Sequence, residues 1–427
     1  MHVNLILLNL TYKIKCESMN QLYKLQFLIL LAFPFKYYTQ GFQVNLQGQK
    51  QQGMGGAGTA LMQDASALFF NPGGASFVHG NSIIADVTPT FARGAFMDAN
   101  TKQISRTNSP VSTPFAAYGL FEIKDSSKLK LGLAVYTPFG STVQWGDNWT
   151  GRFALTRLEL RAIFFQPTIS YRINDKIGIG ASFIYVNGKV NLQKDIPVID
   201  QNGTYGHAEL NGKASGYGFN AGIYYKPIEK LSIGLTYRSK VDMNVNDGQA
   251  TFKVPSALAA NFPDGKFSSS LPLPNVATLG FAYNINSKFD VALDINYVGW
   301  KAYDTLSFDY ENNTTSLIDT KSARMYKNTF AFRGGAQYKI NTQFTARLGL
   351  AYGITPVQNG YVTPETPDAN RINYTAGIGY ALGKHLKIDA SFLFTHLQRT
   401  DTNTETNLSG TFKTNVIAPG ISIGYKF

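Results

Sequence analysis

The chain ends with Ile421-Ser422-Ile423-Gly424-Tyr425-Lys426-Phe427, in which large apolar or aromatic residues alternate with small or polar ones. Alternation with a period of two places successive side chains on opposite faces of a β-strand, one apolar and one polar. The same pattern recurs upstream in segments of about ten residues, which is typical of a transmembrane β-barrel. A closed barrel can cross lipid because every backbone N–H and C=O is paired between strands.

The alternating segments predict an antiparallel barrel of about fourteen strands over residues 81–427. The connections between them alternate short and long, and we expect long outer loops at residues 193–212 and 246–270 among others. An even strand number would place both ends of the barrel on the periplasmic side. The predicted strands are 81–93, 113–122, 128–137, 159–173, 176–191, 213–226, 230–244, 271–285, 288–309, 324–340, 343–354, 371–382, 385–399 and 411–427.

The alternation also predicts which face of each strand meets lipid. In 289–297 the odd positions are large and apolar, whereas the even positions include Asp290 and Asp294. A charged side chain facing lipid costs about 2–4 kcal/mol at the membrane midplane, so the charges are expected in the lumen. They would form an ion-pair network that stiffens the wall, or one or two arginines would bind an anionic headgroup. The expected lumenal charges are Arg238, Asp290, Asp294, Arg333, Arg347 and Asp389.

Composition limits the possible partners and cofactors. The net charge is +12, but no long Lys/Arg run exists, so anionic outer-membrane lipid is a better match than nucleic acid. The single cysteine, Cys16, lies in the N-terminal leader, and the histidines show no metal-ligand spacing. We therefore expect no disulfide, no metal site and no cofactor.

Residues 1–40 are predicted to be a leader. Lys24 precedes the apolar run 25–33, which is too short to span a bilayer and is typical of a signal peptide. Met19 is a possible true start, and cleavage is expected near residues 40 and 41. Export without a stop-transfer helix indicates the outer membrane of a double-membraned bacterium, where the terminal Phe427 is expected to be recognised by the barrel-assembly machinery.

Residues 41–80 do not alternate and are predicted to form a plug inside the barrel. Gly53, Gly55 and Gly58 match G-x-G-x-x-G, but the polar run 47–52 before them cannot be the buried strand that a dinucleotide site needs. Small residues instead allow close packing against an inner wall, and Asn71-Pro72 would fix a turn. A barrel of this size would enclose open space without such a filling.

The run 53–74, with Asp64-Ala65-Ser66-Ala67 and Asn71-Pro72, resembles the FadL/TodX family of outer-membrane long-chain fatty acid and hydrocarbon transporters. Further similar stretches keep their order over nearly all of 41–427. They include Pro138-Phe139-Gly140, Trp149-Thr150-Gly151-Arg152 and Pro367-Asp368-Ala369-Asn370-Arg371. The resemblance implies a fourteen-stranded barrel with an N-terminal hatch, capture of ligand among the outer loops, an inner apolar site and sideways exit through a kink in the third strand.

In one position the sequence departs from the family. The family's Asn-Pro-Ala in the hatch is here Asn71-Pro72-Gly73, and we expect the glycine to remove a methyl contact and loosen this gating turn. Apolar residues of the loop 254–273 would either pack the loop against itself or form the outer capture groove, with the 193–212 loop as its other wall. The predicted ligand-binding residues are Ala257, Leu258, Phe262, Phe267, Arg333 and Arg347.

The sideways exit is placed at Thr137-Pro138-Phe139-Gly140, because proline removes a ladder donor and glycine permits a bend. The predicted function is passive uptake of hydrophobic molecules such as long-chain fatty acids, without catalysis. One alternative is a general porin for small polar solutes. The other is an outer-membrane lipid hydrolase, for which His385 and His396 near Ser391 are the candidate pair.

Overall fold

The computed structural model describes residues 41–427 except 126 and 147. The predicted leader, with Cys16 and Met19, lies outside the described residues. Among the residues that are described, no helix is long and apolar enough to cross a membrane.

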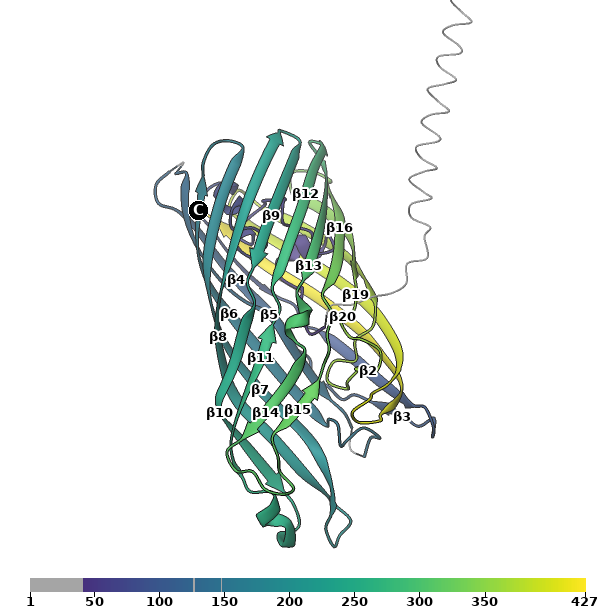
Figure 1. Cartoon of the computed structure of the whole chain (residues 1–427). Coiled ribbons are helices and arrows are strands. Elements are labelled where there is room, and N and C mark those ends of the chain that lie inside the picture. The colour runs from purple at the N-terminus through teal and green to yellow at the C-terminus, as the bar shows by residue number, and fades with distance from the viewer. Residues whose placement is uncertain (1–40, 126, 147) are drawn as a thin grey trace, which may run out of the picture. The chain divides into compact units, whose positions relative to one another are not determined.

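The described chain forms one closed antiparallel barrel of fourteen strands, as predicted (Figure 1). Several barrel strands are drawn as two consecutive segments because loops or bulges interrupt them. The sheet closes where β1 pairs with β20, from Ser82↔Lys426 to Val87↔Ile421. The segments are β1 (Ser82–Val87), β2 (Phe91–Asp98), β3 (Ile104–Arg106), β4 (Phe115–Glu122), β5 (Leu129–Gln144), β6 (Arg157–Arg172), β7 (Ile177–Ile199), β8 (Tyr205–Ile228), β9 (Leu231–Arg238), β10 (Val241–Lys253), β11 (Gly265–Leu273), β12 (Val276–Asn286), β13 (Phe289–Val298), β14 (Thr305–Tyr310), β15 (Thr320–Ala323), β16 (Thr329–Lys339), β17 (Phe344–Gly353), β18 (Arg371–Leu382), β19 (Leu386–Thr402) and β20 (Ser409–Lys426).

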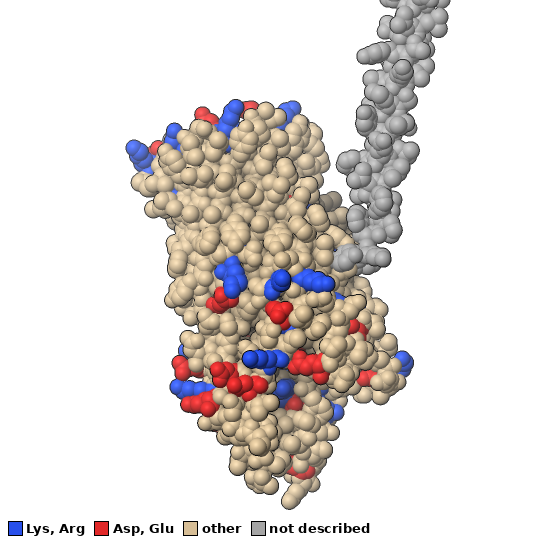
Figure 2. All heavy atoms as spheres, viewed as in Figure 1, with Lys and Arg blue, Asp and Glu red and all other residues tan. Residues whose placement is uncertain are grey.

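The two faces of the wall follow the predicted alternation. In β13 the even positions are buried toward the lumen, while Leu293 is 45% exposed on the outer face. On the face formed by β9, β12, β13 and β16, Figure 2 shows a broad band without Lys, Arg, Asp or Glu between charged groups at the upper rim and others that begin about half-way down the view. This uncharged band is the surface that meets hydrocarbon.

The prediction of a long loop at 193–212 is wrong. β7 continues to Ile199 and β8 begins at Tyr205, so most of this range is a regular hairpin that extends beyond the barrel. In this part of β8 the outward-facing positions are polar, as at His207, Glu209 and Asn211, so the pattern of a lipid-facing strand is lost although backbone pairing continues. The predicted loop 246–270 likewise contains the end of β10, the short 3-10 helix η2 (Ser256–Asn261) and the start of β11.

Residues 41–80, here called the hatch, lie inside the barrel. They contain the short helices α2 (Gln49–Gln52) and α3 (Ala67–Phe70) and the 3-10 helix η1 (Gly74–Phe77). Helix α2 packs against β18 and β19, whereas η1 packs against β6 and β7. At Gly55, with φ +73°, a side chain would come within 2.4 Å of the Leu350 carbonyl oxygen. The hatch glycines therefore bring backbone against backbone of the wall, which larger residues would prevent.

Candidate functional site, a cavity at the break in the third barrel strand

The third barrel strand, β5, separates from its neighbour halfway along its length. It pairs with β4 from Lys130 to Tyr136 and no further, and its register against β6 shifts between Tyr136 and Phe139. At the break the Phe115 N–H donates to Oγ1 of Thr137 at 3.2 Å, so a side chain replaces the backbone partner. Pro138 follows and has no N–H to donate. The extra residue and the missing donor together produce the register shift.

The hatch pairs with the edge of β5 that β4 leaves free. The Val44 N–H donates to the Pro138 carbonyl oxygen at 2.8 Å, and the Gly140 N–H donates to the Phe42 carbonyl oxygen at 3.4 Å. Nε2 of Gln47 donates to the Thr137 carbonyl oxygen at 3.0 Å. Backbone groups that would otherwise be unpaired in the wall are thus satisfied from inside, by a segment that is not part of the barrel.

Phe42 anchors this segment in a cluster of aromatic rings. Its ring centroid lies 4.8 Å from that of Trp300, in the 3-10 helix η3 (Trp300–Ala302), and 5.6 Å from that of Tyr303. The ring of Phe139, at the break itself, lies 6.1 Å away. Edge-to-face aromatic pairs of this kind add about 0.5–1.5 kcal/mol each beyond area burial. The position of the hatch is therefore coupled to the break and to the outer loop that follows β13.

A cavity of about 570 Å³ opens between this segment and the barrel wall. Its size lies within the range of about 300–1,000 Å³ that is usual for small-molecule sites. Inside the barrel it is lined by apolar side chains of the hatch, β19 and β20, among them Phe42, Leu393 and Val416. Its lining also includes Thr142 and Arg161, whose cross-strand register places them on the outer face. The cavity therefore touches residues on both sides of the wall at the break.

The connection between β17 and β18, residues 354–370, covers the outer end of the cavity. Nε1 of Trp145 donates to the Pro364 carbonyl oxygen at 3.2 Å, and Arg324 forms an ion pair with Glu365 at 2.9 Å. Asp401 accepts from the backbone N–H groups of Gly360 and Val362. This connection is thus fixed by contacts to three separate parts of the barrel, at Trp145, Arg324 and Asp401.

Asp368 is a buried carboxylate in the lining of the cavity. It accepts from the Gly41 N–H at 3.0 Å and from Oγ1 of Thr355 at 2.8 Å, which links the start of the hatch to the β17–β18 connection. Burial raises the pKa of Asp368 to about 6, against the opposing effect of the nearby Arg371. This carboxyl group therefore changes charge in the mildly acidic range.

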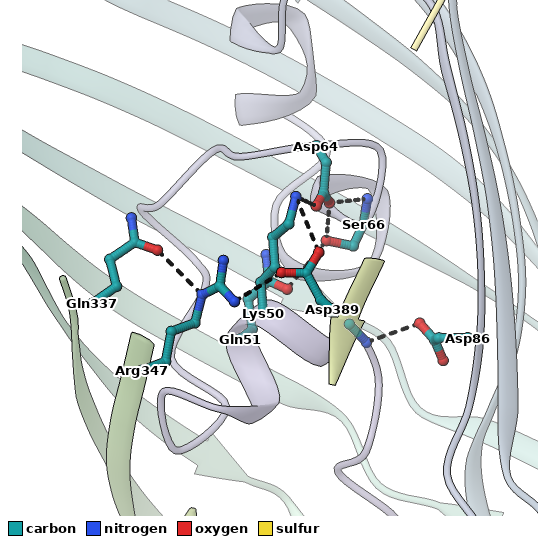
Figure 3. Close-up of polar contacts among 9 residues, drawn as sticks. Lys50, Gln51, Asp64, Ser66, Asp86, Gln337, Arg347 and Asp389 are labelled. Atoms are coloured by element: carbon teal, nitrogen blue, oxygen red, sulfur yellow. Dashed lines mark hydrogen bonds and ion pairs between the residues drawn. The ribbon is translucent and has the colours of Figure 1, made fainter. Parts of the chain in front are cut away.

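The lumenal charges all face inward as predicted, and several of them bind the hatch. Lys50 lies 2.6 Å from Asp64 and 3.8 Å from Asp389, which in turn pairs with Arg347 at 2.8 Å (Figure 3). Nε of Arg347 also donates to Gln337 at 3.3 Å. The network joins the hatch to β16, β17 and β19.

Two further lumenal charges bind the backbone of the hatch directly. Asp294 accepts from the backbone N–H groups of Gly58 and Thr59 at 2.9 and 3.0 Å. Arg238 donates to the Phe69 carbonyl oxygen at 3.0 Å. The wall therefore uses its charged groups to orient hatch backbone as well as to form ion pairs.

The six predicted ligand-binding residues lie outside the large cavity. Ala257, Leu258 and Phe262 are in or next to η2, beyond the barrel wall, and Phe267 is buried in β11. Arg347 belongs to the hatch network, and Arg333 lines a separate pocket of about 30 Å³ together with Asp294. Their role in ligand binding stays a prediction. Three of the four residues predicted for the exit, Thr137, Phe139 and Gly140, line the large cavity, whereas Pro138 does not.

The hatch turn at Asn71-Pro72-Gly73 is tightly packed, so the expectation that glycine loosens it is wrong. A methyl group on Gly73 would lie 2.4 Å from the Gly222 carbonyl oxygen and 3.0 Å from that of Gly178. Nδ2 of Asn71 donates to the carbonyl oxygens of Thr59 and Ile223, which fixes the turn against β8. Glycine here permits a closer approach to the wall.

The residues considered for a hydrolase are not brought together. Ser391 faces the lumen and bonds to Gln49, whereas His396 bonds to Asn415 on the outer face of the same sheet. His385, in the turn before β19, bonds to the Lys426 carbonyl oxygen. No Ser–His pair for nucleophilic catalysis exists among these residues.

Sequence reasoning missed most of the cavity lining. The lining combines residues of the hatch, of the β17–β18 connection and of the last two strands, which are far apart in the chain. In the sequence, Pro367-Asp368 stands out only as part of a family-like stretch. No local pattern marks Leu393 or Val416 as lining residues, since they alternate like any other lumenal position.

A closed barrel with an internal hatch and an apolar cavity at its wall defines an outer-membrane transport protein. The chain belongs to the outer membrane protein transport protein family (OMPP1/FadL/TodX), whose model matches residues 36–427. Its members are transporters and channels, so the chain is not an enzyme.

Relatives and solved structures agree with this assignment. The chain is 22% identical to the long-chain fatty acid transport protein of Escherichia coli O6:H1, over 85% of this chain and 88% of that protein. Its fold matches the crystal structure of a Pseudomonas aeruginosa FadL homologue with a TM-score of 0.78, at 20% identity, covering 91% of this chain and all of that one. It matches the Ralstonia pickettii toluene transporter TbuX with a TM-score of 0.70, at 19% identity, over 90% and 99% of the two chains.

Proposed function

We propose that this protein carries hydrophobic molecules such as long-chain fatty acids passively across the outer membrane, and releases them sideways through the wall at β5. Family membership supports transport of hydrophobic small molecules as a class. The named relatives handle long-chain fatty acids in one case and toluene in another, so both cargo types are tested below.

An apolar cavity suits such a cargo. A sixteen-carbon chain gains about 0.8 kcal/mol for each CH₂ that leaves water, or roughly 12 kcal/mol in total. A water-filled pore would offer none of this stabilisation. The inner lining by Phe42, Leu393, Val416 and similar side chains provides the required apolar surface.

The single observation that carries the sideways route is the two-sided lining of the cavity at the break. Inward-facing Leu393 and outward-facing Thr142 border the same space, next to the point where β4 and β5 stop pairing. The hatch segment 42–44 is bonded to the free edge of β5. Release of cargo into the membrane then requires only that this segment move, because no regular strand-to-strand hydrogen bonds have to break there.

The route is tested by filling the break. The double variant Pro138→Val, Gly140→Val restores a ladder donor and places two β-branched side chains at the gap. We expect it to abolish uptake of radiolabelled oleate by whole cells while oleate binding to the purified protein is unchanged.

The matched control is Pro167→Val, Gly334→Val, which changes the same residue types at outward-facing positions of regular strands and should leave uptake intact. Persistent uptake by the filled variant would disprove exit at β5. Parallel measurements with toluene, in cells with and without the protein, assign the cargo class.

A further inference from the structure

The outer faces of β6, β7 and β8 carry a row of aromatic side chains. Phe165, Tyr185 and Tyr217 lie directly opposite one another on the three strands. Their ring centroids are 6.1 and 5.5 Å apart. Aromatic rows of this kind mark the boundary between hydrocarbon and headgroups in membrane barrels.

Four residues further out, the same three strands carry a row of positive charges. Arg161 lies opposite Lys189, and Lys189 lies opposite Lys213. Residues directly opposite each other in an antiparallel ladder share one face, with Cβ atoms only about 4.5–5.5 Å apart. Like charges in this arrangement repel one another, so the row is unfavourable unless an anion lies against it.

No acidic side chain of the protein supplies that anion among the described residues. Arg161, Lys189 and Lys213 take part in none of the described ion pairs. Two acids further out on the same face are already engaged. Glu159, two residues beyond Arg161 on β6, pairs with Arg157 at 3.4 Å. Glu209, four residues beyond Lys213 on β8, accepts from Asn191 at 2.6 Å. This leaves three adjacent cations facing outward.

The height of the row matches a layer of lipid headgroups. Four residues span about 13 Å along a strand, and a tilt of about 35–45° reduces this to about 10 Å along the membrane normal. The headgroup layer on each side of a bilayer is about 5–8 Å thick, and long basic side chains can reach back toward it. Negatively charged groups on the outer leaflet are therefore within reach.

We propose that Arg161, Lys189 and Lys213 form a binding site for the phosphate groups of an outer-leaflet glycolipid. Gly140 lies directly opposite Arg161, so the bound lipid would stand beside the break in β5. The site depends only on the location of the barrel in the outer membrane. It would exist whatever the cargo and whether or not release is lateral.

The experiment uses the full mature protein in detergent and purified bis-phosphorylated lipid A as the probe, with binding followed by native mass spectrometry. The triple variant Arg161→Gln, Lys189→Gln, Lys213→Gln should bind lipid A roughly 100-fold more weakly than the wild type. Each basic residue near an anionic surface contributes about fivefold, and the three factors multiply. The charge-preserving variant Lys189→Arg, Lys213→Arg should bind like the wild type.

The matched control Lys226→Gln, Lys288→Gln, Lys384→Gln removes the same charge from the short turns at the opposite end of the barrel and should not change binding. A heat-modifiability shift on gels verifies that each variant is folded. Equal affinity of the triple variant and the wild type would overturn the proposal. The proposal would also be overturned if the wild-type protein bound dephosphorylated lipid A as tightly as bis-phosphorylated lipid A. Displacement of lipid A by millimolar inorganic phosphate would overturn it too, because it would indicate a general anion site.

Discussion

The residue type at some positions of this protein is constrained by the part of the barrel wall that it contacts, as Gly73 illustrates. Its φ of −68° suits any residue, so backbone conformation does not require glycine. Space does, because a methyl group would lie 2.4 Å from the Gly222 carbonyl oxygen, and backbone cannot give way as a flexible side chain can. The residue that the family pattern would place here is therefore the one that this wall excludes.

We predict that Gly73→Ala destabilises the folded protein by about 1–3 kcal/mol, the usual cost of overpacking. Urea unfolding in detergent, followed by tryptophan fluorescence, measures the change. The control is Gly334→Ala, where an added methyl meets nothing nearer than 3.8 Å and stability should be preserved. An unchanged unfolding midpoint for Gly73→Ala would show that the hatch is not pressed against β7 and β8.

Asp368 gives a prediction about pH. Its pKa is raised from 3.8 to about 6 by burial, so the folded protein holds a proton that the unfolded chain has lost in this range. The stabilising contribution is complete below about pH 4 and declines as pH rises through 6. Relative to Asp368→Asn, the wild type should lose up to about 3 kcal/mol between pH 4 and pH 7. Urea unfolding of both proteins at the two pH values tests this, and a constant difference would contradict it.

At the scale of elements, the hatch is held by an ion-pair network whose charged wall residues come from β17 and β19. Asp389 lies between Arg347 and Lys50, and its side chain is 5% exposed. Removing one partner of a buried pair typically costs about 3–5 kcal/mol, because the remaining charges are left without compensation. Asp389→Asn should therefore loosen α2 and expose Lys50 to proteases.

Trypsin digestion in detergent, with the fragments identified by mass spectrometry, should show faster cleavage after Lys50 in Asp389→Asn than in the wild type. Asp175→Asn, in an exposed turn between β6 and β7, is the matched control. Equal cleavage rates would mean that backbone contacts such as those of Asp294 hold the hatch without this network.

The sequence predicts the elements better than it predicts their contacts. Alternation in 289–297 or 231–238 follows from the difference between lipid and lumen, and it yielded the strand number and the inward charges. In the hairpin of β7 and β8 the outward positions such as His207, Glu209 and Asn211 are polar, so the lipid-facing pattern is absent and the sequence there resembles a loop. Pro138 and Gly140 marked the break because proline and glycine act locally.

The cavity could not be predicted in this way. The apolar stretch around Phe262 suggested a capture groove, but apolar character alone does not say which residues meet. Phe42, Asp368 and Val416 come together only when the barrel closes and the hatch enters it. Such long-range contacts leave no periodic signal in the sequence.

At the scale of the whole molecule, the barrel and its hatch together meet two conflicting requirements. The wall must be closed to be stable in lipid, yet the proposed lateral release of a hydrophobic cargo needs an opening in it. The break in β5 satisfies both, because the hatch segment 42–44 supplies the hydrogen bonds that the wall lacks there. The hatch thus fills the lumen and also serves as the hydrogen-bonding partner of one wall strand.

Removal of residues 41–80 separates these two roles. Without the hatch the lumen fills with water, so single-channel recordings in planar bilayers should change from nearly closed to a stable, large conductance. The fourteen strands keep their own pairing, so the variant should still show the heat-modifiability shift of a folded barrel. Oleate uptake should fall, because the apolar wall formed by Phe42 and its neighbours is lost while the pore opens. A deletion variant that stays closed would mean that the outer connections, above all residues 354–370, seal the barrel by themselves.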